Sequence, residues 1–175
     1  MAKSTTKTYK PYYKKAKWSS NIRNINDVIG DSSPIPATDT FSQALQLLLN
    51  PIQSYNTVSQ IYTVKNVEMQ IALQAGQSEN FDNITIYIMY LPQGVTPGND
   101  YELIHPEYIM AYRFIDQPND KDIQYSNPIT VKSRLSRKLN TGDSIIMYIK
   151  GYHSANNNTD QLGVKGICRW WTKAN

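Results

Sequence analysis

The chain has 175 residues, of which 40% are hydrophobic and 18% charged, a composition typical of one globular domain and not of a disordered segment. Its single cysteine excludes an internal disulfide, and without an apolar N-terminal segment or a long apolar run we expect neither a secretory signal nor membrane insertion. The net charge of +4 is unevenly distributed, because residues 1–23 hold seven cations and no acid, whereas the remainder holds 11 cations and 14 acids.

Residues 1–23 are therefore predicted to be a flexible basic arm with a polyanionic partner. Lysines can neutralise phosphates, and aromatic rings can stack on unpaired bases. The irregular spacing of the lysines argues against a stable helix and against sequence-specific readout. A solvated tail that only aids solubility is the alternative, but such tails seldom exclude acids and include aromatic residues. The candidate nucleic-acid-binding residues are Lys3, Lys7, Lys10, Tyr12, Tyr13, Lys14, Lys15, Lys17, Trp18 and Arg23.

Residues 24–54 are predicted to form a linker followed by one short helix. The region 19–40 is rich in Ser, Asn, Asp and Pro, with one short strand expected within 22–29. Thr38 or Asp39 can cap the helix, and Asn50-Pro51 would end it. The apolar residues at helical spacing are Phe41, Ala44, Leu45, Leu48 and Leu49.

Residues 55–175 are predicted to form the body of the protein, an all-β domain. Alternating or continuous apolar residues between turn sequences indicate antiparallel strands. Several short strands with two long loops favour Greek-key crossings, and hence a jelly-roll sandwich with one short helix before it. The predicted strands are 67–74, 83–91, 106–115, 128–135, 143–151 and 163–172, with a weaker one at 55–64.

No catalytic motif stands out, so we expect neither an enzyme nor a metal or cofactor site. His105 and His153 lie far apart in the sequence, and histidines in loops are usually solvated. The stretch "NTGDS" (140–144) offers a hydroxyl and a carboxylate but is more simply a tight turn at Gly142. Cys168 is expected to be a small buried hydrophobe.

The paired tryptophans and a second group of basic residues can each be interpreted in more than one way. Trp170 and Trp171 should point to opposite faces of one strand, so one belongs to the core and the other to the core, an interface or a ligand platform. A second basic cluster could line an interior surface or be an ordinary solvated face. Its members are Lys132, Arg134, Arg137 and Lys138.

Four segments in order resemble the capsid proteins of circular Rep-encoding single-stranded DNA viruses, the circovirus-like group. They are "IYIMYLPQGVTP" (86–97), "HPEYIMAYRF" (105–114), "SRLSRKLNTGDSIIMYIKG" (133–151) and "GICRWWTKAN" (166–175). The resemblance implies a jelly-roll subunit that self-assembles into a small icosahedral shell. It also implies that the basic arm faces a packaged single-stranded genome, that this genome is DNA, and that the protein reaches the host nucleus during assembly and ends in the virion.

Three alternatives remain at this point. A free single-strand-binding protein would explain the arm and the aromatic residues, although its body should then also be basic. A carbohydrate-binding β-sandwich would use exposed tryptophans and Asn-rich loops, but it leaves the arm unexplained. The shell protein of a small RNA virus would share fold and mechanism, because nothing in the arm can report on a 2′-hydroxyl.

Overall fold

The structure is a computed structural model that describes residues 17–30, 35, 39–50, 61–75, 81–115, 126–154 and 160–174. This described part is built almost entirely from β-strands, with one short α-helix and one 3-10 turn. The elements are β1 (Ser19–Ile29), β2 (Asp39–Leu49), β3 (Tyr62–Gln74), β4 (Phe81–Leu91), α1 (Tyr101–Ile104), η1 (Pro106–Tyr108), β5 (Ile109–Ile115), β6 (Ile129–Lys132), β7 (Ser136–Leu139), β8 (Ser144–His153) and β9 (Leu162–Ala174).

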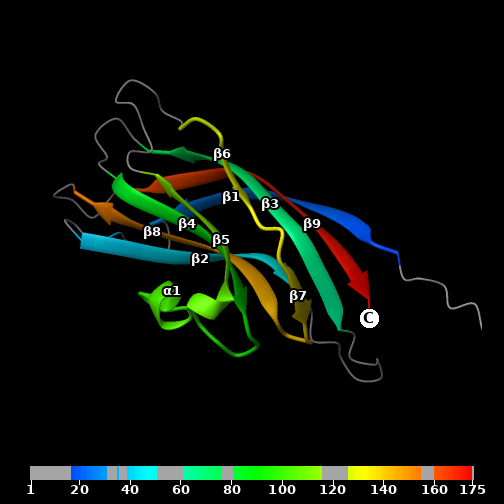
Figure 1. The fold of residues 1–175 in the computed structure, drawn as a ribbon. Coiled ribbons are helices and arrows are strands. Elements are labelled where there is room, and N and C mark those ends of the chain that lie inside the picture. Colours follow the sequence, from blue (N-terminus) through cyan, green and yellow to red (C-terminus); the bar gives the residue numbers. More distant parts are fainter. Residues whose placement is uncertain are drawn as a thin grey trace, which may run out of the picture.

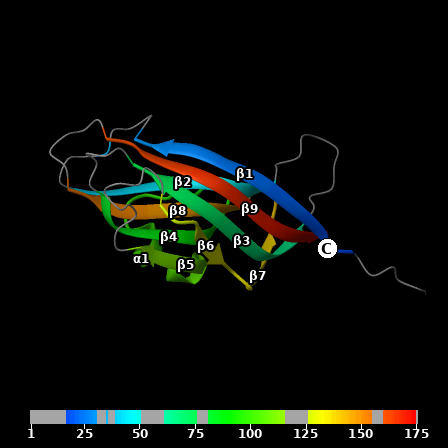
Figure 2. The same ribbon diagram turned by 90° about the horizontal axis from the view of Figure 1, so that it is seen from above.

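The strands form two antiparallel sheets that pack face to face (Figures 1 and 2). Sheet A has the order β1-β9-β3-β6, with β7 also paired to β3, and sheet B has the order β2-β8-β4-β5. The consecutive strands β1 and β2 lie in opposite sheets, as do β3 and β4. Because β6 and β7 share one place beside β3, the arrangement is that of an eight-position double Greek key. The prediction of an all-β jelly-roll sandwich is confirmed.

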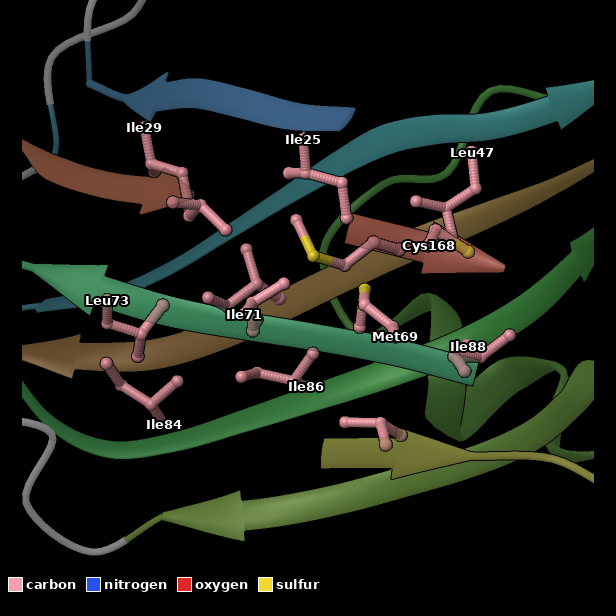
Figure 3. Close-up of a cluster of buried hydrophobic side chains, with 14 of the residues drawn as sticks. Ile25, Ile29, Leu47, Met69, Ile71, Leu73, Ile84, Ile86, Ile88 and Cys168 are labelled. Carbon is pink, nitrogen blue, oxygen red and sulfur yellow. The ribbon is translucent and has the colours of Figure 1, made fainter. Parts of the chain in front are cut away.

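The core lies between the sheets and consists mainly of aliphatic side chains from both (Figure 3). The inward row of β3 meets the inward row of β4, and none of these six side chains is more than 1% exposed. Burying one such side chain stabilises the fold by about 1.5–3 kcal/mol. Cys168 is fully buried here, and burial raises the pKa of its thiol to about 12, as expected of a small inert hydrophobe. The six are Met69, Ile71, Leu73, Ile84, Ile86 and Ile88.

Most predicted strands are present. The six segments after residue 66 each contain a strand, and the short strand expected within 22–29 is part of β1. Of the weaker strand at 55–64, residues 51–60 lie outside the described part of the chain, and β3 begins at Tyr62. The short strand β7 was not predicted.

The predicted helix at 41–49 is wrong, because these residues form β2. β2 pairs with β8 along its whole length, with a bulge between Gln46 and Leu48. The bulge adds Leu47 to the strand and buries it to 1% exposure. An extra leucine in a strand breaks the alternation and imitates helical spacing, and long-range pairing then decides the structure. The short helix lies elsewhere, at α1.

A second bulge explains why β6 ends before its predicted limit. β3 bulges between Lys65 and Glu68, where Asn66 adopts a positive φ of 50°. Before the bulge β3 pairs with β7, and after it with β6. Ser133 bridges the break, since its N–H donates to the Val67 carbonyl at 2.8 Å and its hydroxyl to the Met110 carbonyl at 2.9 Å.

The "NTGDS" stretch is a tight turn, as predicted, with Gly142 at φ 88°. The buried Asp143 carboxylate organises it by accepting hydrogen bonds from the Asn140 N–H at 2.8 Å, the Gln93 N–H at 3.1 Å and the Tyr90 hydroxyl at 2.7 Å. Burial, followed by this contact with Asp143, raises the pKa of Tyr90 to about 12. One carboxylate therefore joins the loop after β4 to the loop before β8.

We expect Asp143→Ala to lower the free energy of unfolding by about 3 kcal/mol, because it leaves three donors unpaired next to a buried position. Urea denaturation measures the loss, and titration of the phenol absorbance should show the pKa of Tyr90 falling. Tyr90 is neutral in the fold, so the stabilisation it gives the unaltered protein is complete below about pH 10 and disappears as the pH rises through about 12. A variant as stable as the parent would show that the turn holds itself together without this carboxylate.

Candidate nucleic-acid interface

The outward side of sheet A gathers positive charge that is scattered in the sequence. Side chains alternate along each strand, and the register aligns the outward positions of β9 with those of β1 and β3. Among the described residues, these positions and the outward positions of β6 and β7, which pair with β3, hold six cations and one acid, Glu68. We call this surface the basic face. Its cations are Lys65, Lys132, Lys138, Lys165, Arg169 and Lys173.

Glu68 lies between two of these cations. It pairs with Arg169 of β9 on one side and with Lys132 of β6 on the other, and the Lys132 ammonium lies 2.9 Å from its carboxylate. The hydrogen bond from Lys132 and the charges of Lys132 and Arg169 hold the pKa of Glu68 below its usual range, against a smaller effect of burial. One acid thus offsets one cation, and the face remains strongly positive at neutral pH.

The basic face continues into the predicted arm. The start of β1 lies beside the end of β9, at the same end of the molecule as the C-terminus (Figure 1). Lys17 and Trp18, the last two residues before β1, are both exposed. The Lys65 ammonium lies 3.9 Å from the centre of the Trp18 ring, a cation–π contact that places Trp18 over sheet A. The chain that leads into the lysine-rich segment therefore leaves from the basic face.

Sheet B presents a different outer side. Tyr101 of α1 packs with Met89, Ile146 and Tyr148 in a small apolar cluster on this side. Lys150, the cation that the described strands of sheet B place here, forms ion pairs with Asp100 and with the buried Glu102, the latter at 2.9 Å. Burial works to lower the pKa of Lys150, but its hydrogen bonds to Asp100 and Glu102 outweigh this and raise it. The charges on this side therefore compensate one another locally.

Large apolar side chains remain exposed next to this cluster. Leu103 and Ile104 of α1 are 71% and 67% exposed, and Tyr112 and Phe114 of β5 are 66% and 54% exposed. Tyr112 and Phe114 lie opposite Tyr87 and Thr85 of β4, on the outer side of sheet B. The two outer sides of the sandwich are thus chemically distinct, one basic and one apolar.

The predicted site residues are only partly brought together. The candidates from Lys3 to Lys15 lie outside the described residues, whereas Lys17 and Trp18 lie at the edge of the basic face. Arg23 points between the sheets instead, and its guanidinium donates to the Leu47 carbonyl at 3.1 Å.

The second basic cluster is divided by the fold. Lys132 and Lys138 lie on the basic face, while the exposed Arg134 lies in the connection between β6 and β7. Arg137 turns to the other side, where it donates to the Glu107 carbonyl and lies 5.5 Å from the centre of the Tyr90 ring. Lys132 and Arg134 therefore do not continue one strand face, because β6 ends at Lys132.

The two histidines differ: His153 is not a loop residue in solvent, contrary to expectation, whereas His105 lies in the connection between α1 and η1 with its side chain 37% exposed. His153 belongs to β8, is fully buried, stacks on Phe81 and lies 3.0 Å from the Asp160 carboxylate. His105 stacks on Tyr108 and contacts Glu107 at 3.1 Å. In the described ranges no group of three or more His, Cys, Asp or Glu side chains is placed to hold a metal ion. No helix among the described residues is long and apolar enough to cross a membrane.

Four cations of the basic face were missed by sequence reasoning, namely Lys65, Lys165, Arg169 and Lys173. A signal was present in β9, where Lys165, Arg169 and Lys173 are each four residues apart and therefore share one side of a strand with Trp171. Trp170, one residue away, packs against the core, so the predicted opposite orientation of the two tryptophans is confirmed.

Comparison with known proteins adds a structural likeness. No family model and no curated protein matches the sequence. Among solved structures, a chain of desmodium yellow mottle tymovirus is similar over 98% of this chain and 97% of its own length, at 10% sequence identity and a TM-score of 0.36.

Proposed function

We propose that this protein is a non-enzymatic viral shell subunit that binds single-stranded nucleic acid through its basic face and arm. The observation on which the proposal depends is the concentration of six cations around one acid on the outer side of sheet A. A sheet surface of one charge sign attracts a polyanion without requiring a particular sequence. The jelly-roll fold is compatible with such a subunit but also occurs in lectins and cupins, so the charge distribution decides.

The other side of the sandwich suits contacts between copies. Tyrosine, phenylalanine and other large apolar side chains are enriched in the centres of protein interfaces, and here they are exposed at Leu103, Ile104, Tyr112 and Phe114. A subunit with nucleic acid on one side and other subunits against its remaining surface can enclose its cargo. In an assembly of many copies, each contact with the nucleic acid raises the effective concentration for the next, so weak basic faces together bind it firmly. Single-stranded DNA, assembly in the host nucleus and location in the virion follow from the resemblance of the four sequence segments and belong to the same proposal.

A free single-strand-binding protein is the second candidate. The sequence alone counted against it because the residues after the arm have a net charge of −3, with 11 cations and 14 acids. The basic face answers that objection, since it holds six cations and one acid among the described residues, so one side of the body is strongly positive.

Sedimentation velocity of the purified, nuclease-treated protein distinguishes the two. The absorbance of protein and of nucleic acid is recorded together, at low salt and with single-stranded DNA added. We expect one fast boundary, far above the monomer, that contains both components, and we expect high salt to release the DNA. A slow boundary in which one or two copies bind the DNA without assembling would favour the free binding protein. Absence of DNA from every boundary would overturn both candidates.

A further inference from the structure

Two tryptophans lie on the basic face at the end where the arm enters. Trp171 is an outward residue of β9 and is paired with Ser20 of β1 on one side and with Lys65 of β3 on the other. Trp18 precedes β1, and its ring lies against the Lys65 ammonium at 3.9 Å. Both indoles therefore lie next to Lys65. The Lys65 ammonium lies over the Trp18 ring, and Trp171 is the residue that pairs with Lys65 between β3 and β9.

The packing of the core does not account for these two rings. Trp170 packs against the core, whereas Trp171 points to the opposite side of the same strand and is only partly buried. Trp18 is 38% exposed. Solvent-facing strand positions among lysines are usually occupied by polar residues, so two large rings placed there leave apolar area available to a ligand.

The surrounding charges indicate the class of ligand. Lys65 touches Trp18, while Arg169 and Lys173 lie two residues to either side of Trp171 on the same side of β9. Aromatic faces alternating with cations match a chain in which flat bases alternate with phosphates. Bases in a duplex already stack on one another, so only unpaired bases have a free face for the indoles.

We propose that Trp18 and Trp171 form a stacking subsite for unpaired bases, with Lys65 and Lys173 contacting the neighbouring phosphates. The inference rests on the proposed function, because it assumes that nucleic acid reaches the basic face, and it adds that this face selects single strands. The Lys65 contact restrains the Trp18 ring before a base arrives, which reduces the entropy lost on binding.

Intrinsic tryptophan fluorescence tests this directly, because the chain has three tryptophans and two of them form the subsite. The full-length protein is titrated with a short oligothymidylate and with an abasic oligonucleotide of the same length and charge. We expect the oligothymidylate to quench the emission and to bind more tightly than the abasic strand, by roughly 5- to 150-fold for each stacked base. A duplex of the same length should leave the emission unchanged.

Two variants locate the effect. Trp171→Thr and Trp18→Ala should each reduce the preference for the oligothymidylate over the abasic strand. They should leave the dependence of affinity on salt unchanged, because no phosphate contact is removed. Circular dichroism checks that each variant is folded, and the comparison of ligands on the unaltered protein does not depend on the variants.

The outcomes separate the two proposals. Equal affinity for the oligothymidylate and the abasic strand, without quenching, would overturn the stacking subsite and leave the proposed function intact. Failure of both strands to bind at low salt would overturn the proposed function itself. Quenching that persists unchanged in both variants would also contradict the subsite, because it would place the base near Trp170 instead.

Discussion

Gly166→Ala is expected to destabilise the protein by at least about 3 kcal/mol, a large part of the 5–15 kcal/mol that stabilises a typical domain. Gly166 of β9 lies opposite Ile25 of β1 and Ile71 of β3 in the middle of sheet A. A Cβ at this position would lie 2.0 Å from the Gln70 carbonyl oxygen and 2.7 Å from the Ile71 Cα. Both are backbone atoms, so no rotation of a side chain relieves the contact, and β9 must separate from β3.

The same strand offers a matched control for this substitution. Gly163 also belongs to β9 and also pairs with β3, opposite Gln74. A Cβ there would come no closer than 3.3 Å, to the Gln74 Cβ, so Gly163→Ala should change the free energy of unfolding by less than about 1 kcal/mol. Urea denaturation of both variants measures the difference. If the two substitutions cost the same, β9 and β3 do not approach each other closely at Gly166.

The strands of the body were predictable because their pattern is local. Val67 to Gln74 alternates cleanly, and the run from Ile84 to Met89 is covered on both sides, by the core within the sandwich and by the α1 cluster outside it. β2 was not predictable in the same way. With Leu47 inserted by the bulge, its leucines fit helical spacing as well as strand alternation, and only the pairing with β8 decides between them.

The basic face was hidden for a different physical reason. A net charge sums over all directions, whereas binding depends on how charge is distributed over one surface. Lys65 and Arg169 are more than 100 positions apart, and they become near neighbours only because β3 and β9 pair. The alternation in β9 could have indicated its three cations, but the sequence does not show which strands lie beside it. The tryptophans illustrate the same limit. The opposite orientations of Trp170 and Trp171 could be predicted from their adjacent positions on one strand, but the position of Lys65 between Trp18 and Trp171 could not.

Reversal of charge on the basic face should weaken binding of single-stranded nucleic acid without unfolding the protein. Arg169 is exposed at the centre of this face, between Ile22 of β1 and Glu68 of β3. Each phosphate contact to a single strand contributes about 0.7 to the slope of log affinity against log salt. Loss of one contact at about 0.1 M salt therefore costs roughly five-fold in affinity, and repulsion by the new carboxylate adds to it. In the double variant Lys165→Glu/Arg169→Glu the lost contacts alone cost roughly 25-fold.

Arg113→Glu is the matched control, because it makes the same change in charge at an exposed arginine on β5, the edge strand of sheet B. If the basic face is the binding surface, Arg169→Glu lowers affinity and reduces the salt slope by about 0.7, while Arg113→Glu does neither. Fluorescence anisotropy of a labelled oligonucleotide over a series of salt concentrations measures both quantities. Equal losses of affinity in the two variants would mean that the oligonucleotide responds only to the total charge of the protein. The arm would then be the whole of the interface, and the arrangement of cations on sheet A would have no part in binding.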